Sequence, residues 1–497
     1  MLPALPAHVW LLQAAAVATP IRLTGNNAFA NARQWGLDGN FMQPQPPNVG
    51  FPTLQGFQSF YGQSDQWQCH DYFPPFQFNN TDNHTIDRNV GASVETCGPE
   101  HANCVWSADL WTADAADWIT AQASGKEGGP GSPWFLYLAY TAPHAGSVGS
   151  VGENDVPAPR VSQGPYAVHN GSWPAVEVHF ATAVTEIDAG VGTVLAALET
   201  SGQVQSTVVF FSSDNGAHQE GGHHYQFFNS SGSLNGYKRS IHDGGHRAAF
   251  IVRWPGMVKA GSVSDHQLCF YDFLPTAAEL AGISAKALGL ELPAPIDGIS
   301  FAPTLLGKVQ PQPPFIYHEF GGPQDPVFEG ATFPKSFGQN VRMGTWSGVC
   351  VSAGAPCMEE TNMTFFLYDM DKDQSQLHDV SSANPTVVNK IKSLMVEQYN
   401  KTFDPNGVVH HHGGGGGGGG GTLDDSTSPS LVSHCNDNVI ISVHSGSDSY
   451  CTPTLLWSAQ AGRLNRVCGR KPLRAARHSP RVRVMPKRSP FKAIPQN

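Results

Sequence analysis

The sequence predicts an α/β protein with a mostly parallel central sheet and helices on both faces of that sheet. An amphipathic helical pattern over residues 179–198 leads into a buried strand at 207–212, and a second apolar strand lies at 134–140. A helix that feeds a buried strand is part of a β–α–β unit, whose strands run parallel. From Pro311 onward short strands precede a helical pattern over 385–399, which predicts a small C-terminal antiparallel sheet with a helix.

The strand at 207–212 is followed by the polar run Ser213-Asp214-Asn215-Gly216. Ligands of open α/β sheets bind at the carboxyl ends of the strands. The carboxylate of Asp214 and the amide of Asn215 offer hard oxygen donors, which suit Ca²⁺ or Mg²⁺ better than Zn²⁺. Asp-Asn-Gly is also a common turn sequence, so these residues alone leave a metal site and a simple turn open.

The strand at 134–140 runs into Thr141-Ala142-Pro143-His144. Proline stops a strand, so His144 is predicted to lie at the end of this one. A histidine in that place is either a ligand-binding residue or a loop residue whose hydrogen bonds are satisfied locally.

Length and charge indicate a large acidic body with a basic end. The chain has 497 residues and a formal charge of -11, although residues 463–497 hold 11 Lys or Arg and no acid. A chain this long predicts a large core with an appended smaller domain. The basic end is expected to be a solvated tail rather than a nucleic-acid or membrane-binding segment.

Several features favour a secretory compartment. Residues 8–18 form a short apolar segment like a signal-peptide core, without the basic residues that usually precede one, and no apolar stretch is long enough to span a membrane. Cys97 with Cys104 and Cys350 with Cys357 have the separations of local disulfides. The chain has six Asn-x-Ser/Thr glycosylation sites, at Asn79, Asn83, Asn170, Asn229, Asn362 and Asn400.

The stretch after Gly216 carries a specific resemblance. It contains Gly236-Tyr237-Lys238, then Asp243-Gly244-Gly245-His246-Arg247, an apolar strand at 248–252 and Trp254-Pro255-Gly256. This order resembles the second signature of the sulfatases, in which Ser-Asp-Asn-Gly precedes a Gly-x-Lys, a Glu-Gly-Gly-x-Arg, a strand and Trp-Pro-Gly. The segments at 55–62, 134–144, 273–282 and 297–301 are also similar to sulfatase segments. The resemblance covers about Phe51 to Leu306 and implies the alkaline-phosphatase-like fold.

The resemblance implies a site. Asp214 and Asn215 correspond to metal ligands, with Ca²⁺ favoured over Mg²⁺. Lys238 corresponds to a cation that meets a sulfate oxygen, and His144 to a residue that contacts the sulfate and can protonate the leaving group. His242 is a lesser candidate, interpreted as a loop residue.

The family's nucleophile is absent from this sequence. In sulfatases it is the oxidised Cys, or Ser, of a Cys-x-Pro-x-Arg motif, and no Cys or Ser here begins such a motif. Cys97-Gly98-Pro99 and Cys451-Thr452-Pro453 lack the Arg. The paired acids of the family's first strand are also missing.

Two functions therefore remain open. The first is a metal-dependent sulfuric ester hydrolase of the arylsulfatase type, incomplete as written, which acts on an aryl or carbohydrate sulfate. The second is a non-catalytic relative that binds sulfated or acidic glycans. The expected parts are a divergent segment at 1–48, the sulfatase catalytic remainder at 49–308, a sheet-and-helix subdomain at 309–403, and a Gly-rich linker with a basic disordered tail at 404–497.

Overall fold

The computed structural model describes fifteen stretches of the chain, all within the first of its two units, residues 1–458 and 459–497. The described residues are 21–26, 52–54, 57–63, 70–80, 82–92, 94–97, 103–124, 133–146, 155–282, 298–321, 337–352, 363–399, 402–403, 409–410 and 438–444. The predictions about the signal-like segment, Cys357, Asn362, Asn400, the glycine run and Cys451 lie outside them.

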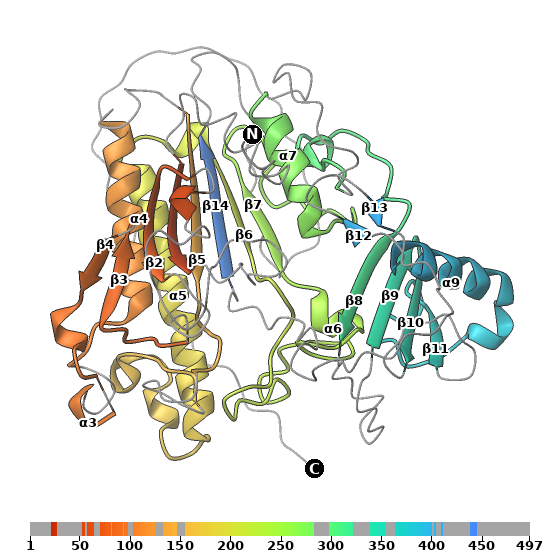
Figure 1. The fold of residues 1–497 in the computed structure, drawn as a ribbon, viewed down its shortest axis with the longest axis horizontal. Helices are drawn as coiled ribbons and strands as arrows, with labels where there is room; N and C mark the ends of the chain where they lie inside the picture. The colour runs from red at the N-terminus through yellow and green to blue at the C-terminus, as the bar shows by residue number, and fades with distance from the viewer. Residues whose placement is uncertain are drawn as a thin grey trace, which may run out of the picture. The chain divides into compact units, whose positions relative to one another are not determined.

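In the part of the chain that the structure describes, a central sheet of eight strands organises the body (Figure 1). In spatial order its strands are β4 (Asp82–Thr85), β3 (Phe76–Asn79), β2 (Ser59–Gln63), β1 (Ile21–Asn26), β5 (Trp134–Tyr140), β14 (Asn438–His444), β6 (Thr207–Ser212) and β7 (Phe250–Arg253). The strands predicted at 134–140 and 207–212 are thus confirmed.

The prediction of a mostly parallel sheet is not confirmed. Among the described strands, β1 is parallel to its neighbours β2 and β5, whereas β14 is antiparallel to both β5 and β6. The outer pairs β2–β3, β3–β4 and β6–β7 are antiparallel too. Strands β2, β1, β5 and β6 still share one direction, so the parallel framework exists, but β14 interrupts it.

Strand β14 falls within residues 404–497, where a Gly-rich linker and a basic disordered tail are predicted, and it departs from that prediction at 438–444. Residues 438–444 pair along their length with β5 and β6, at the centre of the sheet. The sequence Asn-Val-Ile-Ile-Ser-Val-His is rich in β-branched residues, which favour strands. The glycine run and the basic end on either side outweighed this short pattern in the sequence-based interpretation.

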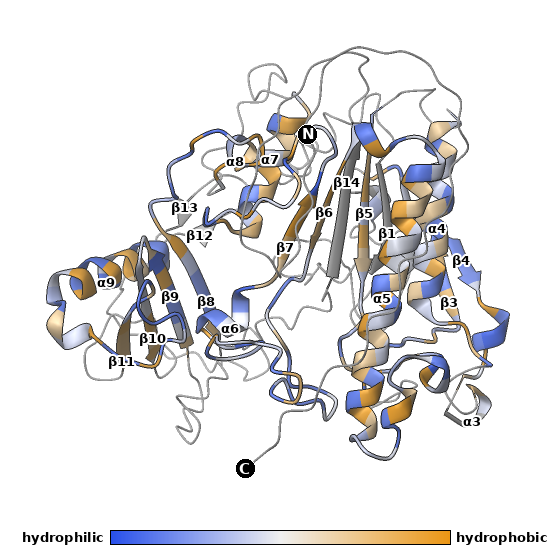
Figure 2. Ribbon diagram, turned by 180° about the vertical axis from the view of Figure 1, so that it is seen from behind, coloured by the Kyte–Doolittle hydropathy of each residue, from blue (hydrophilic) through white to orange (hydrophobic). Residues whose placement is uncertain are grey.

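Helices cover both faces of the sheet, as predicted. Helices α4 (Ser107–Ala123) and α5 (Ala175–Thr200) pack on each other, and Val209 of β6 belongs to the same buried cluster as their apolar residues. The neighbouring Val208 and Phe210 belong to a second cluster, against α7 (Phe273–Leu280) and α8 (Ala302–Leu305). Successive strand residues point to opposite faces, so the two clusters lie on opposite sides. Figure 2 shows β6 and β7 as hydrophobic strands and β4 as a hydrophilic one.

The predicted C-terminal sheet and helix are present. Its antiparallel strands are β8 (Ile316–Gly321), β9 (Phe337–Met343), β10 (Trp346–Ser352) and β11 (Met363–Asp369), and its helix is α9 (Pro385–Tyr399). Ile391 and Met395 of α9 are buried against one face of this sheet. Ile241 packs on the opposite face, against Val349 and Tyr368. The small sheet thereby supports the segment that follows Lys238.

The remaining α-helices and strands of the described residues are short: α3 (Val94–Cys97), α6 (Asp243–His246) and the strand pair β12 (Thr402–Phe403) and β13 (Val409–His410). One predicted disulfide is confirmed. Cys97 is bonded to Cys104, and Cys350 is also in a disulfide.

Among the described helices, α5 has the length and apolar composition of a membrane-crossing segment. Its buried residues, which include Val178, Ile187, Val194 and Leu198, belong to the main core. Those contacts are the ones expected of a core helix.

Candidate functional site

Strands β5 and β6 flank β14 and end at the same edge of the sheet. Their last residues, Tyr140 and Ser212, pair with the adjacent residues Asn438 and Val439 of β14. The loops that follow carry His144 and Asp214, so both begin at one edge of the sheet. This edge is where open α/β sheets place their ligands.

His144 is held by its main chain and its ring. Tyr72 Oη donates a hydrogen bond of 2.6 Å to the His144 carbonyl oxygen, and His144 Nδ1 lies 2.8 Å from the Ala145 carbonyl oxygen. A carbonyl only accepts, so Nδ1 carries a proton. Burial, and then the charge of Lys238, lower the pKa of His144 well below 6.5. The ring is therefore neutral at neutral pH, and Nε2, which faces the site, is unprotonated.

The loop after Asp214 folds back on itself through main-chain contacts. Gly216 N donates to Gly245 O at 3.0 Å, and Lys238 N donates to Ala217 O at 2.6 Å. A side chain at Gly216 would place its Cβ 1.8 Å from the Gly244 carbonyl oxygen, so only glycine fits at this crossing. These contacts bring Lys238 to the loop that carries Asp214 and Asn215.

A neutral histidine joins this loop to the end of β5. His218 Nε2 donates to Pro143 O at 2.9 Å, while Nδ1 accepts from Glu220 N at 3.2 Å. Burial, and then the charge of Lys238, lower the pKa of His218 to about 3. His218 therefore stays neutral and acts as a structural link next to His144.

The same loop is anchored to α5. The buried carboxylate of Glu177 lies 2.6 Å from His223 Nδ1 and accepts from His224 N at 2.9 Å. The His223 ring stacks on Phe180 with centroids 3.8 Å apart. The backbone around Glu220 is thus fixed by contacts on both sides.

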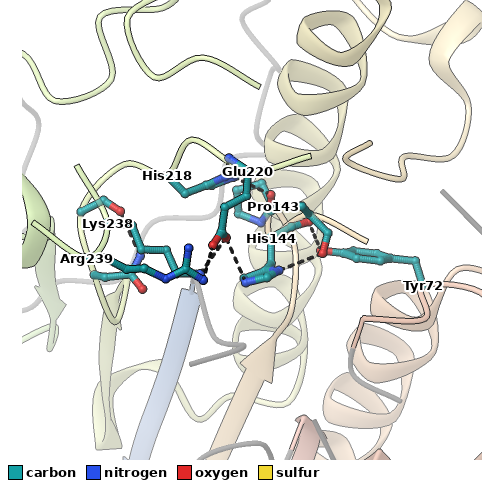
Figure 3. A network of polar contacts seen from close by, with 10 residues as sticks. Tyr72, Pro143, His144, His218, Glu220, Lys238 and Arg239 are labelled. Carbon is teal, nitrogen blue, oxygen red and sulfur yellow. Dashed lines mark hydrogen bonds and ion pairs between the residues drawn. The ribbon is translucent and has the colours of Figure 1, made fainter. Parts of the chain in front are cut away.

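Glu220 lies at the centre of the polar network (Figure 3). Its Oε2 accepts from Lys238 Nζ at 3.0 Å and lies 3.2 Å from His144 Nε2, while Oε1 lies 2.6 Å from an Arg239 guanidinium nitrogen. Lys238 and His144 are buried, with side chains 4% and 7% exposed. Two predicted site residues therefore meet at one carboxylate oxygen.

Arg239 reaches this carboxylate through an unusual backbone. Its φ is +73°, in the left-handed region that residues with a side chain seldom adopt. In this conformation the successive side chains of Lys238 and Arg239 both reach Glu220. Burial raises the pKa of the Glu220 carboxyl, but the charges of Lys238 and Arg239 outweigh burial and lower it to about 2.

Asp214 and Asn215 follow β6 as predicted. Both carboxylate oxygens of Asp214 are buried, and its charge adds to burial in raising the pKa of Tyr137. Asn215 Nδ2 donates to Gly216 O at 2.9 Å, which orients its amide. The donor types fit a hard cation, but no group of three or more metal-binding side chains occurs among the described residues. A hard cation takes six to eight oxygens, so these two residues alone would supply only part of a shell.

The His242 ring contacts the small C-terminal sheet. It is fully buried, and its Nε2 is 3.3 Å from Tyr368 Oη of β11. Glu220 and Arg239 were not predicted as site residues. Glu220 is a lone acid in a Gly- and His-rich loop, and the left-handed conformation that turns Arg239 toward it cannot be read from the sequence. Neither residue therefore has a local sequence signal.

Comparison with known proteins assigns the chain to a family. The family model described as Sulfatase matches residues 33–283. Rat steryl-sulfatase is 38% identical over 144 residues, which cover 28% of this chain and 24% of the relative. Mouse N-acetylgalactosamine-6-sulfatase is 34% identical over 216 residues (42% and 34%), and human arylsulfatase A is 28% identical over 261 residues (48% and 46%). The matched regions thus span less than half the length of these relatives.

Solved structures share the fold. The crystal structure of Ps i-CgsB superposes with a TM-score of 0.53 at 18% identity, covering 79% of this chain and 77% of that one. A structure labelled BT33336S-sulf, from work on glycosaminoglycan metabolism in Bacteroides thetaiotaomicron, gives 0.51 at 20% identity, covering 80% and 84%. Since the matching family model spans half of the chain, the protein belongs to the sulfatase family.

Proposed function

We propose that this protein serves sulfuric ester hydrolysis of the arylsulfatase type, with the sulfate ester of an aryl or carbohydrate compound as its substrate. One observation carries the proposal: Lys238 Nζ and His144 Nε2 lie 3.0 and 3.2 Å from the same carboxylate oxygen. The buried ammonium of Lys238 is suited to an oxygen of a bound anion, and the imidazole of His144 adds a donor to the same point once its Nε2 has taken up a proton.

Each residue has a distinct task in this proposal. Lys238 is a compact charge that offsets negative charge on the sulfate group in the transition state. His144 carries its fixed proton on Nδ1, so Nε2 takes up a second proton before it can donate to a sulfate oxygen or to a leaving group. Tyr72, which holds the His144 carbonyl, is a positioning residue.

We propose Ca²⁺ as the metal, with Mg²⁺ less favoured, held in part by Asp214 and Asn215. Their oxygens are of the type that these cations prefer, and further ligands must complete the shell. Bound Ca²⁺ would supply positive charge beside the anion. Calcium titration of the wild-type protein and of Asp214→Asn, followed by the melting temperature, tests this assignment. Equal stabilisation of both proteins would reject Asp214 as a ligand.

The second candidate is a non-catalytic protein that binds sulfated or acidic glycans. It is favoured by the absence of Cys-x-Pro-x-Arg from this sequence, because a nucleophile opens a reaction path that binding groups cannot replace. The anion contacts of Lys238 and His144 serve this function equally well.

Hydrolysis of a chromogenic aryl sulfate, with Ca²⁺ added, separates the two functions. Residues 1–497 are expected to show no turnover. The genomic sequence upstream of the Met1 codon is searched for Cys-x-Pro-x-Arg, and any such version is co-expressed with the oxidising enzyme. Turnover that falls by about 10² or more in Lys238→Met supports the hydrolase. An extended protein that binds aryl sulfate without turnover supports the glycan-binding function, and turnover by residues 1–497 that Cys451→Ala abolishes would overturn the proposed site.

We also propose that the protein enters the secretory pathway, to an extracellular or lysosome-like destination. The Cys97–Cys104 disulfide supports this, because disulfides persist in oxidising compartments. Four predicted glycosylation sites, Asn79, Asn83, Asn170 and Asn229, are exposed. Expression in a secretory host followed by glycosidase treatment should lower the apparent mass; an unchanged mass would contradict the proposal.

A further inference from the structure

The position proposed for a sulfate oxygen is filled by the protein itself. Glu220 Oε2 lies within 3.2 Å of both Lys238 and His144, and Oε1 binds Arg239. A carboxylate resembles a sulfate ester in its single negative charge and its hydrogen-bond-accepting oxygens. The same contacts cannot serve both at once. We infer that Glu220 is an internal occupant of the anion site, and that a sulfate group binds only by displacing its side chain.

This inference rests on the proposed function, since it assumes that Lys238 and His144 form an anion site. It goes further by assigning to Glu220 a role in setting the affinity and selectivity of that site. A site that is open about a tenth of the time binds its ligand about tenfold more weakly than one that is always open. An anion therefore binds this site only if it makes more contacts, or carries more negative charge, than the Glu220 carboxylate that it displaces.

Displacement has to occur by side-chain rotation, because the backbone on both sides of Glu220 is fixed. Glu220 N donates to His218 Nδ1, which is itself bonded to Pro143 O. Gly221, with a φ of +62°, is packed so closely that a Cβ would lie 2.7 Å from Asp155 O and 2.8 Å from Ala145 Cβ. The loop therefore cannot shift as a whole without breaking these contacts.

Exposure indicates the direction of movement. The side chain of Glu220 is 16% exposed and that of Arg239 is 27% exposed, whereas Lys238 and His144 are nearly inaccessible. Arg239 is thus placed to keep its ion pair with Oε1 while Oε2 rotates away from Lys238. In this movement the Glu220 negative charge stays neutralised, and Lys238 and His144 become available to the incoming anion.

Binding of inorganic sulfate to the full chain tests the inference. Titration calorimetry is performed at constant ionic strength on wild type, Glu220→Gln, Glu220→Asp and the control Glu199→Gln, whose side chain is 65% exposed and lies 3.9 Å from Arg253. Glu220→Gln is expected to bind sulfate at least about tenfold more tightly than wild type. Glu199→Gln should match wild type.

The Glu220→Asp variant distinguishes two explanations for weak sulfate binding: that the Glu220 carboxylate fills the anion site, or that its negative charge merely repels sulfate. It keeps the negative charge but shortens the side chain by one methylene, so the carboxylate no longer reaches Lys238. Occupancy predicts a severalfold gain in sulfate affinity, whereas repulsion alone predicts none. If Glu220→Gln fails to fold, the Glu220→Asp variant still tests the inference. Sulfate affinity that is unchanged in every folded Glu220 variant would overturn the inference.

Lys238→Met distinguishes failure of the inference from failure of the proposed function. If Lys238→Met weakens sulfate binding but the Glu220 variants bind like wild type, the anion site stands and Glu220 is not its occupant. If sulfate affinity is indifferent to Lys238 in both the wild-type and Glu220→Gln backgrounds, the anion site and the inference both fail. If Glu220→Gln raises sulfate affinity and the added Lys238→Met substitution removes that increase, both the anion site and the role of Glu220 are supported.

Discussion

Tyr72 Oη donates a hydrogen bond of 2.6 Å to the main-chain carbonyl oxygen of His144, 72 residues further along the chain. Tyr72 is 1% exposed and its ring stacks on Trp106, so its hydroxyl is fixed in place. This bond joins the aromatic segment before α3 to the loop that presents His144.

Tyr72→Phe should therefore lower the free energy of unfolding by about 1 to 2 kcal/mol, because a buried carbonyl loses its donor. Urea unfolding measures the change, and sulfate titration shows whether His144 has shifted. Tyr225→Phe is the control, since its hydroxyl takes part in an exposed hydrogen bond of 3.2 Å. Equal stabilities of Tyr72→Phe and wild type would contradict the structural role of the bond.

The ion pairs of Glu220 should make stability depend on pH in a defined window. The folded pKa of about 2 is below the ordinary 4.5, so the stabilising contribution is complete above pH 4.5 and is lost as pH falls toward 2. Its size is on the order of 3 kcal/mol. The measured quantity is the difference in unfolding free energy between wild type and Glu220→Gln.

That difference is expected to be constant above about pH 5.5 and to shrink below pH 4.5. Glu199→Gln should differ from wild type by less than about 1 kcal/mol, as is usual for exposed pairs. A difference for Glu220→Gln that persists unchanged at pH 2 would show that its carboxylate is not held by Lys238 and Arg239.

The Cys97–Cys104 disulfide should stabilise the protein measurably. It closes a loop with a sequence separation of 7, and chain-entropy reasoning assigns such a loop about 2 to 3 kcal/mol. The Cys97→Ser, Cys104→Ser double variant is expected to unfold at correspondingly lower urea. Cys269→Ser is the control, because Cys269 is a free thiol. A double variant as stable as wild type would indicate that the loop is held by other contacts.

Gly216→Ala should disrupt the loop that carries Asp214 and Asn215. The added Cβ would lie 1.8 Å from Gly244 O, so one of the two crossing backbone segments must move. We expect a loss of more than about 2 kcal/mol. In contrast, Gly192→Ala in α5 meets nothing within 4 Å and should gain about 0.5 to 1 kcal/mol from helix propensity. Similar effects of both variants on the melting temperature would refute the close crossing.

Two truncations test the place of β14 in the central sheet. Removal of residues 459–497 should leave the melting temperature nearly unchanged, because so basic a segment is expected to bury little apolar area. Removal of 404–497 also deletes β14 and leaves β5 and β6 without their shared neighbour, so it should lower the melting temperature by many degrees. Equal melting temperatures of the two truncated proteins would support the disordered tail that composition predicts.

Sequence patterns predicted the parts of the fold that depend on local periodicity. The bounds of β5, β6 and α9 agree with the apolar runs and the helical spacing. β14 was not predicted because a seven-residue strand between a glycine run and a basic end has no local partner to reveal it. Its place depends on pairing with strands more than 200 residues away.

In the candidate site, too, some features follow from local sequence patterns and others from long-range contacts. The positions of His144 and Asp214 at the ends of β5 and β6 follow from strand patterns and the resemblance. The contacts of Glu220 depend on the left-handed Arg239 and on the folding of the loop over Gly216, which are three-dimensional properties. No spacing rule links a lone Glu to a Lys 18 residues later.

The position of β14 has a consequence for how the protein is made. During translation β5 and β6 leave the ribosome early, but the strand that joins them follows about 225 residues after the end of β6. At 5 to 20 residues per second this interval is roughly 10 to 45 s. Throughout it the inner edges of β5 and β6 expose unpaired backbone groups, which are a template for wrong pairing. Nascent chains of this protein should therefore depend on chaperones until residue 444 has emerged.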